Sequence, residues 1–367
     1  MNNIAYICPI KKVRLDYHEI SNKINIDDSG FYYADKSPYV YPVINQTPIF
    51  FVFPTKITQS FFDRNRELIQ KIKKGGICPD KSPEKGEASV QKTFTEQWTN
   101  LGDDELSFTY THDDLVYLHK SVWLHDDPTI IKKINVLNIG CGFGFEAMVL
   151  ADIFSNATIY AIDLNLSVVK AGKKLIEKSG SKVVPIAASL FHLPFDEDTF
   201  CHIHCQGVAH HTYSTQDAYK AISRHVNARL GSIFFWVYAW EDSMGMPGLR
   251  GALIRMYWFL SHRLLRPILS RAPSSVRAFT ILTMAVPYHF LVSKRRGRLR
   301  EKWKFKNTMH GLRDMFTPQY AHQHRWNEVI GWLEESGFEM QVQKKHDFEK
   351  KFSQRMLGIG LFGKRVA

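Results

Sequence analysis

The spacing of apolar residues alternates between two periods from residue 136 onward. Short apolar runs bounded by turn residues indicate buried strands, and they read VLNIG, TIYAID, VVPIAA, HIHCQGV and IFFWVYAW. Between these runs, apolar residues recur every three or four positions, which predicts helices over residues 146–154, 167–178 and 216–227. Strands that are apolar on both faces and alternate with helices are typical of a parallel, doubly wound sheet.

The alternation is interrupted once and then resumes. It is lost after Trp240 and returns with the helix NEVIGWLEESG and two closing strands, EMQVQ and MLGIGLFG. This arrangement predicts an α/β fold with a mostly parallel, doubly wound, seven-stranded Rossmann-like sheet, a small N-terminal β module and a helical lid insertion. The expected units are residues 1–55 for the module, 56–130 for a linker and helical segment, 131–240 with 324–367 for the sheet domain, and 241–323 for the lid.

The stretch VLNIGCGFGFEA places Gly140, Gly142 and Gly144 directly after the first of these strands. Glycine allows backbone N–H groups at the start of a helix to approach a ligand closely. The dinucleotide pattern G-x-G-x-x-G is not completed, because Phe145 stands at the position of its third glycine. The second strand ends in Asp163, which is placed either to accept the ribose hydroxyls of an adenosine or to cap the next helix.

Four segments carry a resemblance to one enzyme family. LNIGCGFG, AIDLN, AASLFHLPFDEDTF and CQGVAHHTYSTQDAYKAISRHVNARLGSIFFWVYA resemble the successive motifs of class I S-adenosylmethionine-dependent methyltransferases over roughly residues 131–240. The resemblance implies S-adenosylmethionine as the cofactor, with the glycine turn under its methionine part, Asp163 at the ribose and Gln206 beside the methyl group. The expected cofactor contacts are Trp98, Asn138, Gly140, Cys141, Gly142, Gly144, Asp163, Leu164, Ser189, Leu190 and Gln206.

Three positions depart from the pattern of that family. Asn138, Ser189 and Cys201 stand where its members usually have acidic residues, so the cofactor would meet less negative charge. The departures leave open a binding protein that keeps the fold without turnover. Asp163 and the three glycines favour an enzyme instead.

The N-terminal segments YICPIKKVRLDY and YVYPVINQTPIFF resemble the zinc-ribbon module that activates tRNA and release-factor methyltransferases. Only Cys8 matches a metal ligand of that module, because Lys11 replaces the expected partner and SPYVYP has no cysteine pair. A structural zinc site needs about four ligands, so we expect a metal-free module and assign no metal ligand in the chain. SVQKTFTEQW resembles the segment that precedes the catalytic domain in fused proteins, so Phe94 and Trp98 either close over the cofactor or belong to the core.

Methyl transfer to a hydroxyl or a protonated amine requires an aligned acceptor and the removal of a proton. Histidine has a suitable pKa for this task, and GVAHHT places two histidines directly after the fourth strand. RDMFTPQYAHQHRWNEVIGWLEESGF resembles the segment by which the fused methyltransferases return to the core. The candidate catalytic residues are therefore His210, His211, Asp314, Tyr320 and His324, each with a structural role as the alternative.

The net charge of +12 is concentrated in residues 250–306, which hold fourteen Lys and Arg against one acid. GALIRMYWFLSHRLLRPILSR predicts a basic amphipathic helix that is broken or kinked near Pro267. Such a segment is a solvated insertion, a surface for anionic membranes or a nucleic-acid contact. Its aromatic and aliphatic residues favour peripheral membrane association over nucleic acid.

Five cysteines without a C-x-x-C pair, and an N-terminus unlike a signal peptide, predict a cytoplasmic protein that associates with the inner face of the membrane if the basic segment is exposed. The resemblance implies O- or N-methylation of a small biosynthetic acceptor, with lipid-linked and glycan-derived molecules among the candidates. The apolar residues of the lid predict an acceptor with an apolar portion. An alternative acceptor is tRNA or a translation protein, but CQGVAHH lacks the N-P-P-Y-type motif used for planar amine nitrogens. The pattern makes no prediction of the oligomeric state.

Overall fold

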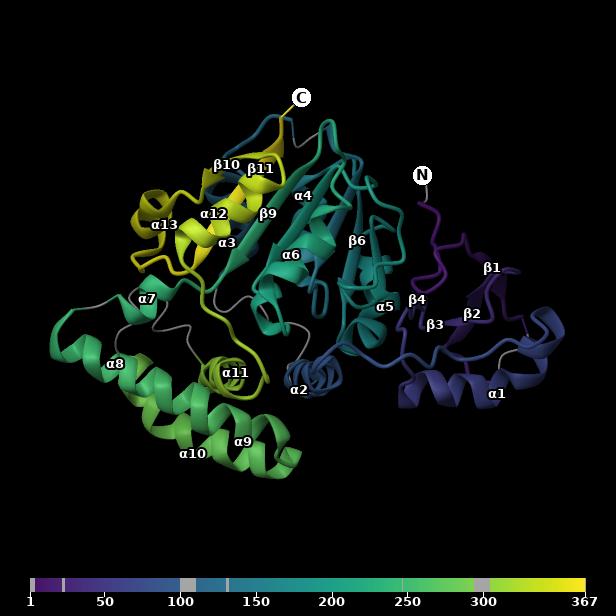
Figure 1. The fold of residues 1–367 in the computed structure, drawn as a ribbon, viewed down its shortest axis with the longest axis horizontal. Coiled ribbons are helices and arrows are strands. Elements are labelled where there is room, and N and C mark those ends of the chain that lie inside the picture. Colours follow the sequence, from purple (N-terminus) through teal and green to yellow (C-terminus); the bar gives the residue numbers. More distant parts are fainter. Residues whose placement is uncertain are drawn as a thin grey trace.

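A seven-stranded sheet in the order β10-β11-β9-β8-β5-β6-β7 forms the centre of the protein (Figure 1). The computed structural model describes residues 4–21, 24–99, 110–129, 132–245, 247–293 and 304–366. The strands are β5 (Asn135–Ile139), β6 (Thr158–Asp163), β7 (Val183–Ala187), β8 (His202–Gln206), β9 (Ser232–Val237), β10 (Phe338–Val342) and β11 (Ile359–Arg365). Neighbouring strands are parallel except at β11, which is antiparallel to both β9 and β10. The predicted mostly parallel, seven-stranded sheet is confirmed.

The direction of winding reverses at β5, which lies between β8 and β6. Open α/β sheets bind ligands beside such a reversal, at the carboxyl ends of the strands. Val136 and Leu137 of β5 are fully buried in the two different cores that flank the sheet. The strand is therefore apolar on both faces, as its sequence indicates.

Helices cover both faces of this sheet. One face packs against α6 (Thr215–Ser223) and α12 (Trp326–Glu335). The other packs against α3 (His112–Tyr117), a π-helical turn (Leu118–Trp123), α4 (Phe145–Ile153), α5 (Ser167–Lys178) and α13 (Lys345–Phe352). Helix α5 has the predicted bounds. Helix α6 is shorter than the expected 216–227: the Ser214 hydroxyl accepts from Asp217 N and fixes its start, and its last helical residue is Ser223.

A second, antiparallel sheet of β1 (Asp16–Glu19), β2 (Asp28–Tyr33), β3 (Tyr41–Ile44) and β4 (Thr47–Pro48) lies beside β7 (Figure 1). Phe50 N donates to Ala187 O at 2.8 Å, which joins this module to the edge of the main sheet. Helix α1 (Lys56–Ile72) follows, and the Thr55 side chain caps its first turn. The small N-terminal β module predicted from the sequence is therefore present.

The environment of Cys8 differs from that of a metal ligand in a zinc ribbon. The thiol is fully buried, and its Sγ lies 3.2 Å from the Tyr41 hydroxyl and 3.5 Å from the Ser37 hydroxyl. These neutral hydroxyl groups satisfy the thiol, whereas a structural zinc site would surround it with further thiolates or imidazoles. The likeness of the module to a zinc ribbon stays a prediction.

A layer of helices lies next to the sheet domain, around α2 (Glu87–Thr99) (Figure 1). It consists of α7 (Trp240–Met244), α8 (Gly248–Leu260), a π-helical turn (Ser261–Leu265), α9 (Arg266–Arg271), α10 (Ser274–Ser293) and α11 (Phe305–Phe316). This lid has a small core of its own, formed by Leu269, Ile281, Ala285, Leu312 and Phe316. Within the described ranges, none of the helices has the length and apolar character needed to cross a bilayer.

The expected break near Pro267 takes the form of a π-helical turn. Residues 248–271 run as one helical rod, and the π-helical turn Ser261–Leu265 directly precedes Pro267. Pro267 then occupies the first turn of α9, where a missing N–H group is tolerated.

Candidate active site

A cavity opens at the carboxyl ends of β5, β6 and β8, between the sheet and α2. It contains about 960 Å³ of unfilled space, part of which is open to solvent. The predicted site residues that line it are Trp98, Gly140, Asp163, Leu164, Ser189, Leu190, Gln206, His211, Asp314 and Tyr320. The predicted residues outside its lining are Asn138, Cys141, Gly142, Gly144, His210 and His324.

The three glycines of the turn adopt conformations that other residues rarely take. Gly140, Gly142 and Gly144 have φ values of 79°, 58° and 84°. A Cβ atom on Gly140 would lie 2.1 Å from the Val208 side chain, and one on Gly142 would lie 3.1 Å from the Trp98 ring. Both backbone shape and packing therefore require glycine here.

The N–H groups of this turn are already engaged. Gly140 N donates to Ile162 O at 2.7 Å, and Gly142 N donates to the Asp163 carboxylate at 2.6 Å. Because these donors are occupied within the protein, the turn is not a phosphate cradle of the dinucleotide type. This agrees with the incomplete G-x-G-x-x-G pattern.

Asp163 lies at the end of β6 with its carboxylate mostly buried. Its two oxygens accept from Gly142 N at 2.6 Å and from Asn165 N at 2.8 Å. Burial raises the pKa of Asp163 to about 6, although these hydrogen bonds oppose the shift. The carboxylate is therefore ionised at neutral pH and close to titration below it.

Part of the cavity wall comes from a segment that reads as a solvated linker. Glu84, Lys85 and Glu87 line the cavity, and Glu87 is buried, which raises the pKa of its carboxyl group. The charged sequence ICPDKSPEKGEAS indicates a solvated linker, so the sequence did not predict that these residues line the cavity. The helical spacing of Val90 and Phe94, which also line the cavity, is the signal that would have extended the site to α2.

Aromatic rings surround the space above the glycine turn. Phe94 contacts the His211 ring with centroids 5.1 Å apart, and Trp98 covers Gly142. Phe191 and Tyr213 stack at 5.0 Å on another wall. The cavity thus offers flat apolar surfaces beside a few polar groups, as small-molecule sites generally do.

His211 has a fixed tautomer. Its Nδ1 lies 2.8 Å from the Tyr320 carbonyl oxygen, which only accepts, so the ring proton resides on Nδ1. Its Nε2 has no hydrogen-bond partner among the described residues and lies 3.8 Å from an Asp314 carboxylate oxygen. Burial lowers the pKa of His211, while Asp314 opposes that shift. The imidazole is therefore a neutral acceptor in the cavity wall.

Asp314 is also held by Tyr238, whose hydroxyl donates to its other carboxylate oxygen at 2.7 Å. Burial raises the pKa of Tyr238 well above its ordinary value, so this phenol remains a donor. The carboxylate of Asp314 thus stays oriented near His211.

Two of the candidate catalytic histidines lie outside the cavity lining. His210 is fully buried, and its ring packs on Tyr238 with centroids 3.9 Å apart. His324 joins two elements, because its Nε2 lies 2.8 Å from the Thr215 hydroxyl and its Nδ1 lies 3.1 Å from the Glu328 carboxylate. The structure brings His211, Asp314 and Tyr320 together in the cavity lining. His210 lies outside the lining, although its ring packs on the His211 ring with centroids 4.3 Å apart, and His324 also lies outside it.

Comparison with known families covers the glycine turn and the strands that follow it. Residues 136–229 match the family model described as a methyltransferase domain. A search of curated protein sequences finds no significant match.

Among the solved structures with a similar fold are two methyltransferases. The 1,6-didemethyltoxoflavin-N1-methyltransferase of Burkholderia thailandensis, solved with 1,6-didemethyltoxoflavin and S-adenosylhomocysteine, is 12% identical, with 79% of this chain and 93% of that chain covered and a TM-score of 0.42. The magnesium protoporphyrin IX methyltransferase of Synechocystis PCC 6803, solved with S-adenosylmethionine, is 14% identical, with 78% and 100% covered and a TM-score of 0.41.

Proposed function

Because residues 136–229 match a methyltransferase domain, we propose that the protein is an S-adenosylmethionine-dependent enzyme. The expected reaction is methylation of an oxygen or nitrogen atom of a small biosynthetic acceptor with an apolar portion. The observation that carries this proposal is the free Nε2 of His211 in the wall of an aromatic cavity. In this scheme the acceptor gives its proton to Nε2 while its lone pair attacks the methyl carbon, and S-adenosylhomocysteine leaves. Asp314 stabilises the imidazolium that forms.

The experiment that tests this function uses the cofactor itself. Purified protein is incubated with S-adenosylmethionine carrying a labelled methyl group and with extracts of small metabolites and of lipids. We expect label in an organic-soluble product, identified by mass spectrometry. Label only in tRNA or in protein would overturn the proposed acceptor class.

A pH dependence of cofactor binding follows from Asp163. Its raised pKa means that the carboxylate form, which accepts hydrogen bonds from ribose hydroxyls, is lost as the pH falls through about 6. We therefore expect affinity for S-adenosylmethionine to be about tenfold lower at pH 5 than at pH 7. Calorimetry at both pH values measures this. Asp163→Asn should bind weakly at both, and an equally steep loss in that variant would contradict the assignment to Asp163.

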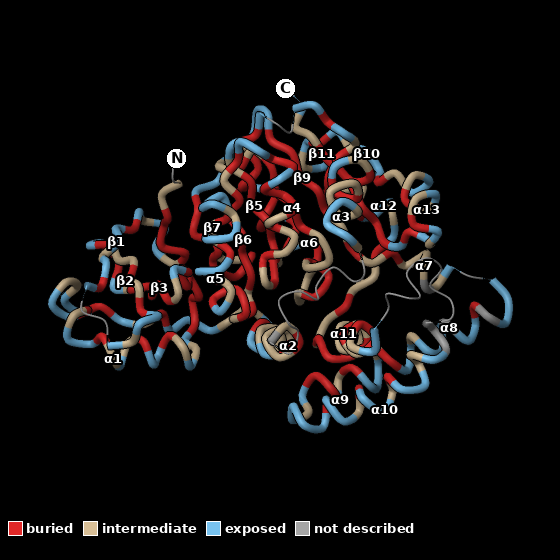
Figure 2. Tube along the Cα trace, turned by 180° about the vertical axis from the view of Figure 1, so that it is seen from behind, coloured by how far each residue is buried: buried red, intermediate tan, exposed pale blue. Residues whose placement is uncertain are grey.

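The lid supports a further part of the proposal, which is peripheral association with the inner face of a membrane. Figure 2 shows α9 and α10 with exposed residues that alternate with buried and half-buried ones. We call their solvent-facing surface, together with that of α8, the outer face. Its exposed large apolar residues are Leu249, Leu253, Met256, Tyr257, Phe259, Leu260, Leu264, Leu265, Ile268, Val276, Phe279, Leu282, Val286 and Phe290. These side chains lie on successive elements of the lid, and large exposed apolar patches are typical of interaction sites.

The charges on the outer face favour an anionic lipid surface. Arg263 and Arg271 are exposed between the apolar side chains. Two other arginines of the lid are buried and serve the protein interior: Arg266 donates to main-chain carbonyls, and Arg277 pairs with Glu96. The apolar residues at helical spacing in this segment, which form its apolar stripe, are all exposed: Leu253, Tyr257, Leu260, Leu264 and Ile268. We therefore propose that this basic amphipathic helix lies in a membrane interface.

Flotation with anionic liposomes tests this association. At low salt we expect the protein to float with the vesicles, and Arg263→Glu with Arg271→Glu to abolish flotation, because attraction to anionic lipid becomes repulsion. The matched control is Lys182→Glu with Arg229→Glu, two exposed residues in the loops that precede β7 and β9. The proposal fails if the wild-type protein stays soluble, or if both double variants lose binding equally.

A further inference from the structure

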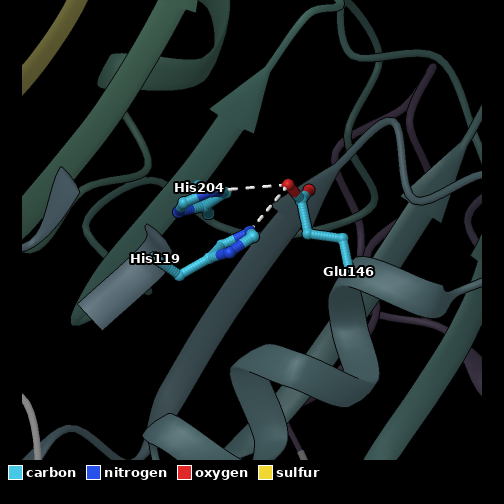
Figure 3. A group of neighbouring side chains, drawn as sticks. All are labelled: His119, Glu146 and His204. Atoms are coloured by element: carbon cyan, nitrogen blue, oxygen red, sulfur yellow. Dashed lines mark hydrogen bonds and ion pairs between the residues drawn. The ribbon is translucent and has the colours of Figure 1, made fainter. Parts of the chain in front are cut away.

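Three side chains from separate elements converge beside the glycine turn. They are His119 from the π-helical turn, Glu146 from the first turn of α4 and His204 from β8 (Figure 3). Each offers one ligand atom, and these atoms all lie within 4.8 Å of one another. His119 and His204 are almost completely buried, whereas the Glu146 side chain keeps 18% of its surface exposed. The cluster does not line the cavity described above.

The hydrogen bonds of His119 require a proton or a metal ion between its ring and Glu146. Its Nδ1 lies 2.8 Å from the Leu115 carbonyl oxygen, which only accepts, so Nδ1 carries the ring proton. In the neutral ring, Nε2 then directs a lone pair at the Glu146 carboxylate, 3.2 Å away. Two acceptors face each other at this distance only if a proton or a metal ion lies between them. A carbonyl that fixes the distal nitrogen is also the usual support of a metal-bound histidine.

His204 strengthens the case, because it is fully buried and neither of its ring nitrogens has a hydrogen-bond partner within the described residues. Its Nε2 points at the same Glu146 oxygen from 3.5 Å (Figure 3). Buried polar atoms are rarely left without partners.

We propose that His119, Glu146 and His204 bind one divalent transition-metal ion, for which Zn²⁺ is the best match. Tetrahedral zinc with N and O ligands at 2.0–2.1 Å separates neighbouring ligand atoms by about 3.3 Å. The two nitrogen-to-carboxylate distances in the cluster, 3.2 and 3.5 Å, agree with that separation. Two imidazoles and a carboxylate leave a fourth position for water.

Polar groups around the cluster fit such a water molecule. Asn138 donates to the second Glu146 oxygen at 2.5 Å, and its own amide oxygen has no partner among the described residues. The Trp123 ring lies 4.5 Å from the His119 ring, between centroids, and its indole N–H also lacks a described partner. An acceptor and a donor are thus left over beside the three ligands.

The bound ion would join the π-helical turn and β8 to Glu146 in the first turn of α4, two residues after Gly144. Its role on this geometry is to stiffen the base of the cofactor turn, since all three ligands lie outside the cavity lining. The proposal rests on the cluster alone and does not depend on the acceptor.

Metal binding is tested on the full chain after removal of metal with a chelator. Zn²⁺ is added back in competition with a chromophoric chelator, and the protein is then dialysed for elemental analysis. We expect one Zn²⁺ per chain, at least tenfold weaker binding in Glu146→Gln and His119→Gln, and a higher unfolding temperature with the ion. Two controls should bind as the wild type does: His112→Gln, an exposed histidine paired with Asp152 on a neighbouring surface, and Cys8→Ser.

A second measurement needs no variant and remains decisive if a variant fails to fold. X-ray absorption of the zinc-loaded wild type should show nitrogen and oxygen ligands at about 2.0–2.1 Å, including two imidazoles. A sulfur ligand would place the ion at a cysteine and overturn the proposal. Failure of the wild type to retain zinc after dialysis, or unchanged affinity in folded Glu146→Gln, would overturn it as well.

Discussion

Replacing Gly142 with valine should abolish the binding of S-adenosylmethionine, a loss of more than about a hundredfold in affinity. Gly142 has a φ of 58°, and its Cβ position lies 3.1 Å from the Trp98 ring, so a branched side chain both strains the turn and pushes the ring away. The turn also donates to Asp163 and would release that carboxylate. Calorimetry with the cofactor measures the loss.

The control for this variant is Gly331→Val in α12, where a Cβ meets nothing within 4 Å. It should fold and bind the cofactor as the wild type does. Asp163→Ala, which leaves the turn sterically unchanged, should weaken binding by about 2–3 kcal/mol through lost charge-assisted hydrogen bonds. Unchanged affinity in both Gly142→Val and Asp163→Ala would refute the cofactor site.

The second large effect is expected at His211. His211→Gln should lower kcat about 10²–10⁴-fold, because glutamine can still donate to the Tyr320 carbonyl but cannot take a proton from the acceptor. Affinity for S-adenosylmethionine should change little. Turnover with the acceptor identified by labelling measures kcat.

A buried histidine away from the cavity provides the matched control. His225 Nδ1 likewise lies 2.9 Å from a main-chain carbonyl, that of Asp196, and His225→Gln should keep kcat within about twofold. Equal turnover in His211→Gln and the wild type would show that the acceptor loses its proton to another group. A similar loss in both variants would instead indicate a general effect of histidine replacement on stability.

The local pattern of apolar residues was sufficient to predict strands and helices in the core of this fold. The run TIYAID corresponds residue for residue to β6, and the period of apolar residues set the bounds of α5. The strand and the helix are each buried against the adjacent elements of the α/β sheet, and this burial alone produces their apolar pattern. Their positions can therefore be predicted without knowing which distant segments they contact. Because parallel strands end at one edge, the position of Asp163 at the cavity followed from the same pattern. Gln206, which also lines the cavity, was expected there from the resemblance to methyltransferases.

Contacts between distant segments could not be read in this way. Glu87 looks solvated in sequence but is buried over the cavity, because α2 is held there by side chains of other elements. His204 lies on an apolar strand, and the residues next to it in the sequence do not indicate that His119 and Glu146 lie beside it in the fold. The outward orientation of the amphipathic stripe was likewise undecided, since a periodic pattern defines a face without saying what it faces.

One carbonyl oxygen connects the outer helix with the chemistry. The Tyr320 oxygen accepts from Arg266 Nη1 at 3.1 Å and lies 2.8 Å from His211 Nδ1, and Arg266 also bonds the Pro318 carbonyl. Arg266 belongs to α9, whose other side carries the outer face. A displacement of α9 would therefore move a guanidinium group that bonds the same carbonyl oxygen as His211 Nδ1. If His211 is the base, as proposed above, we expect displacement of the lid to alter proton transfer in the cavity.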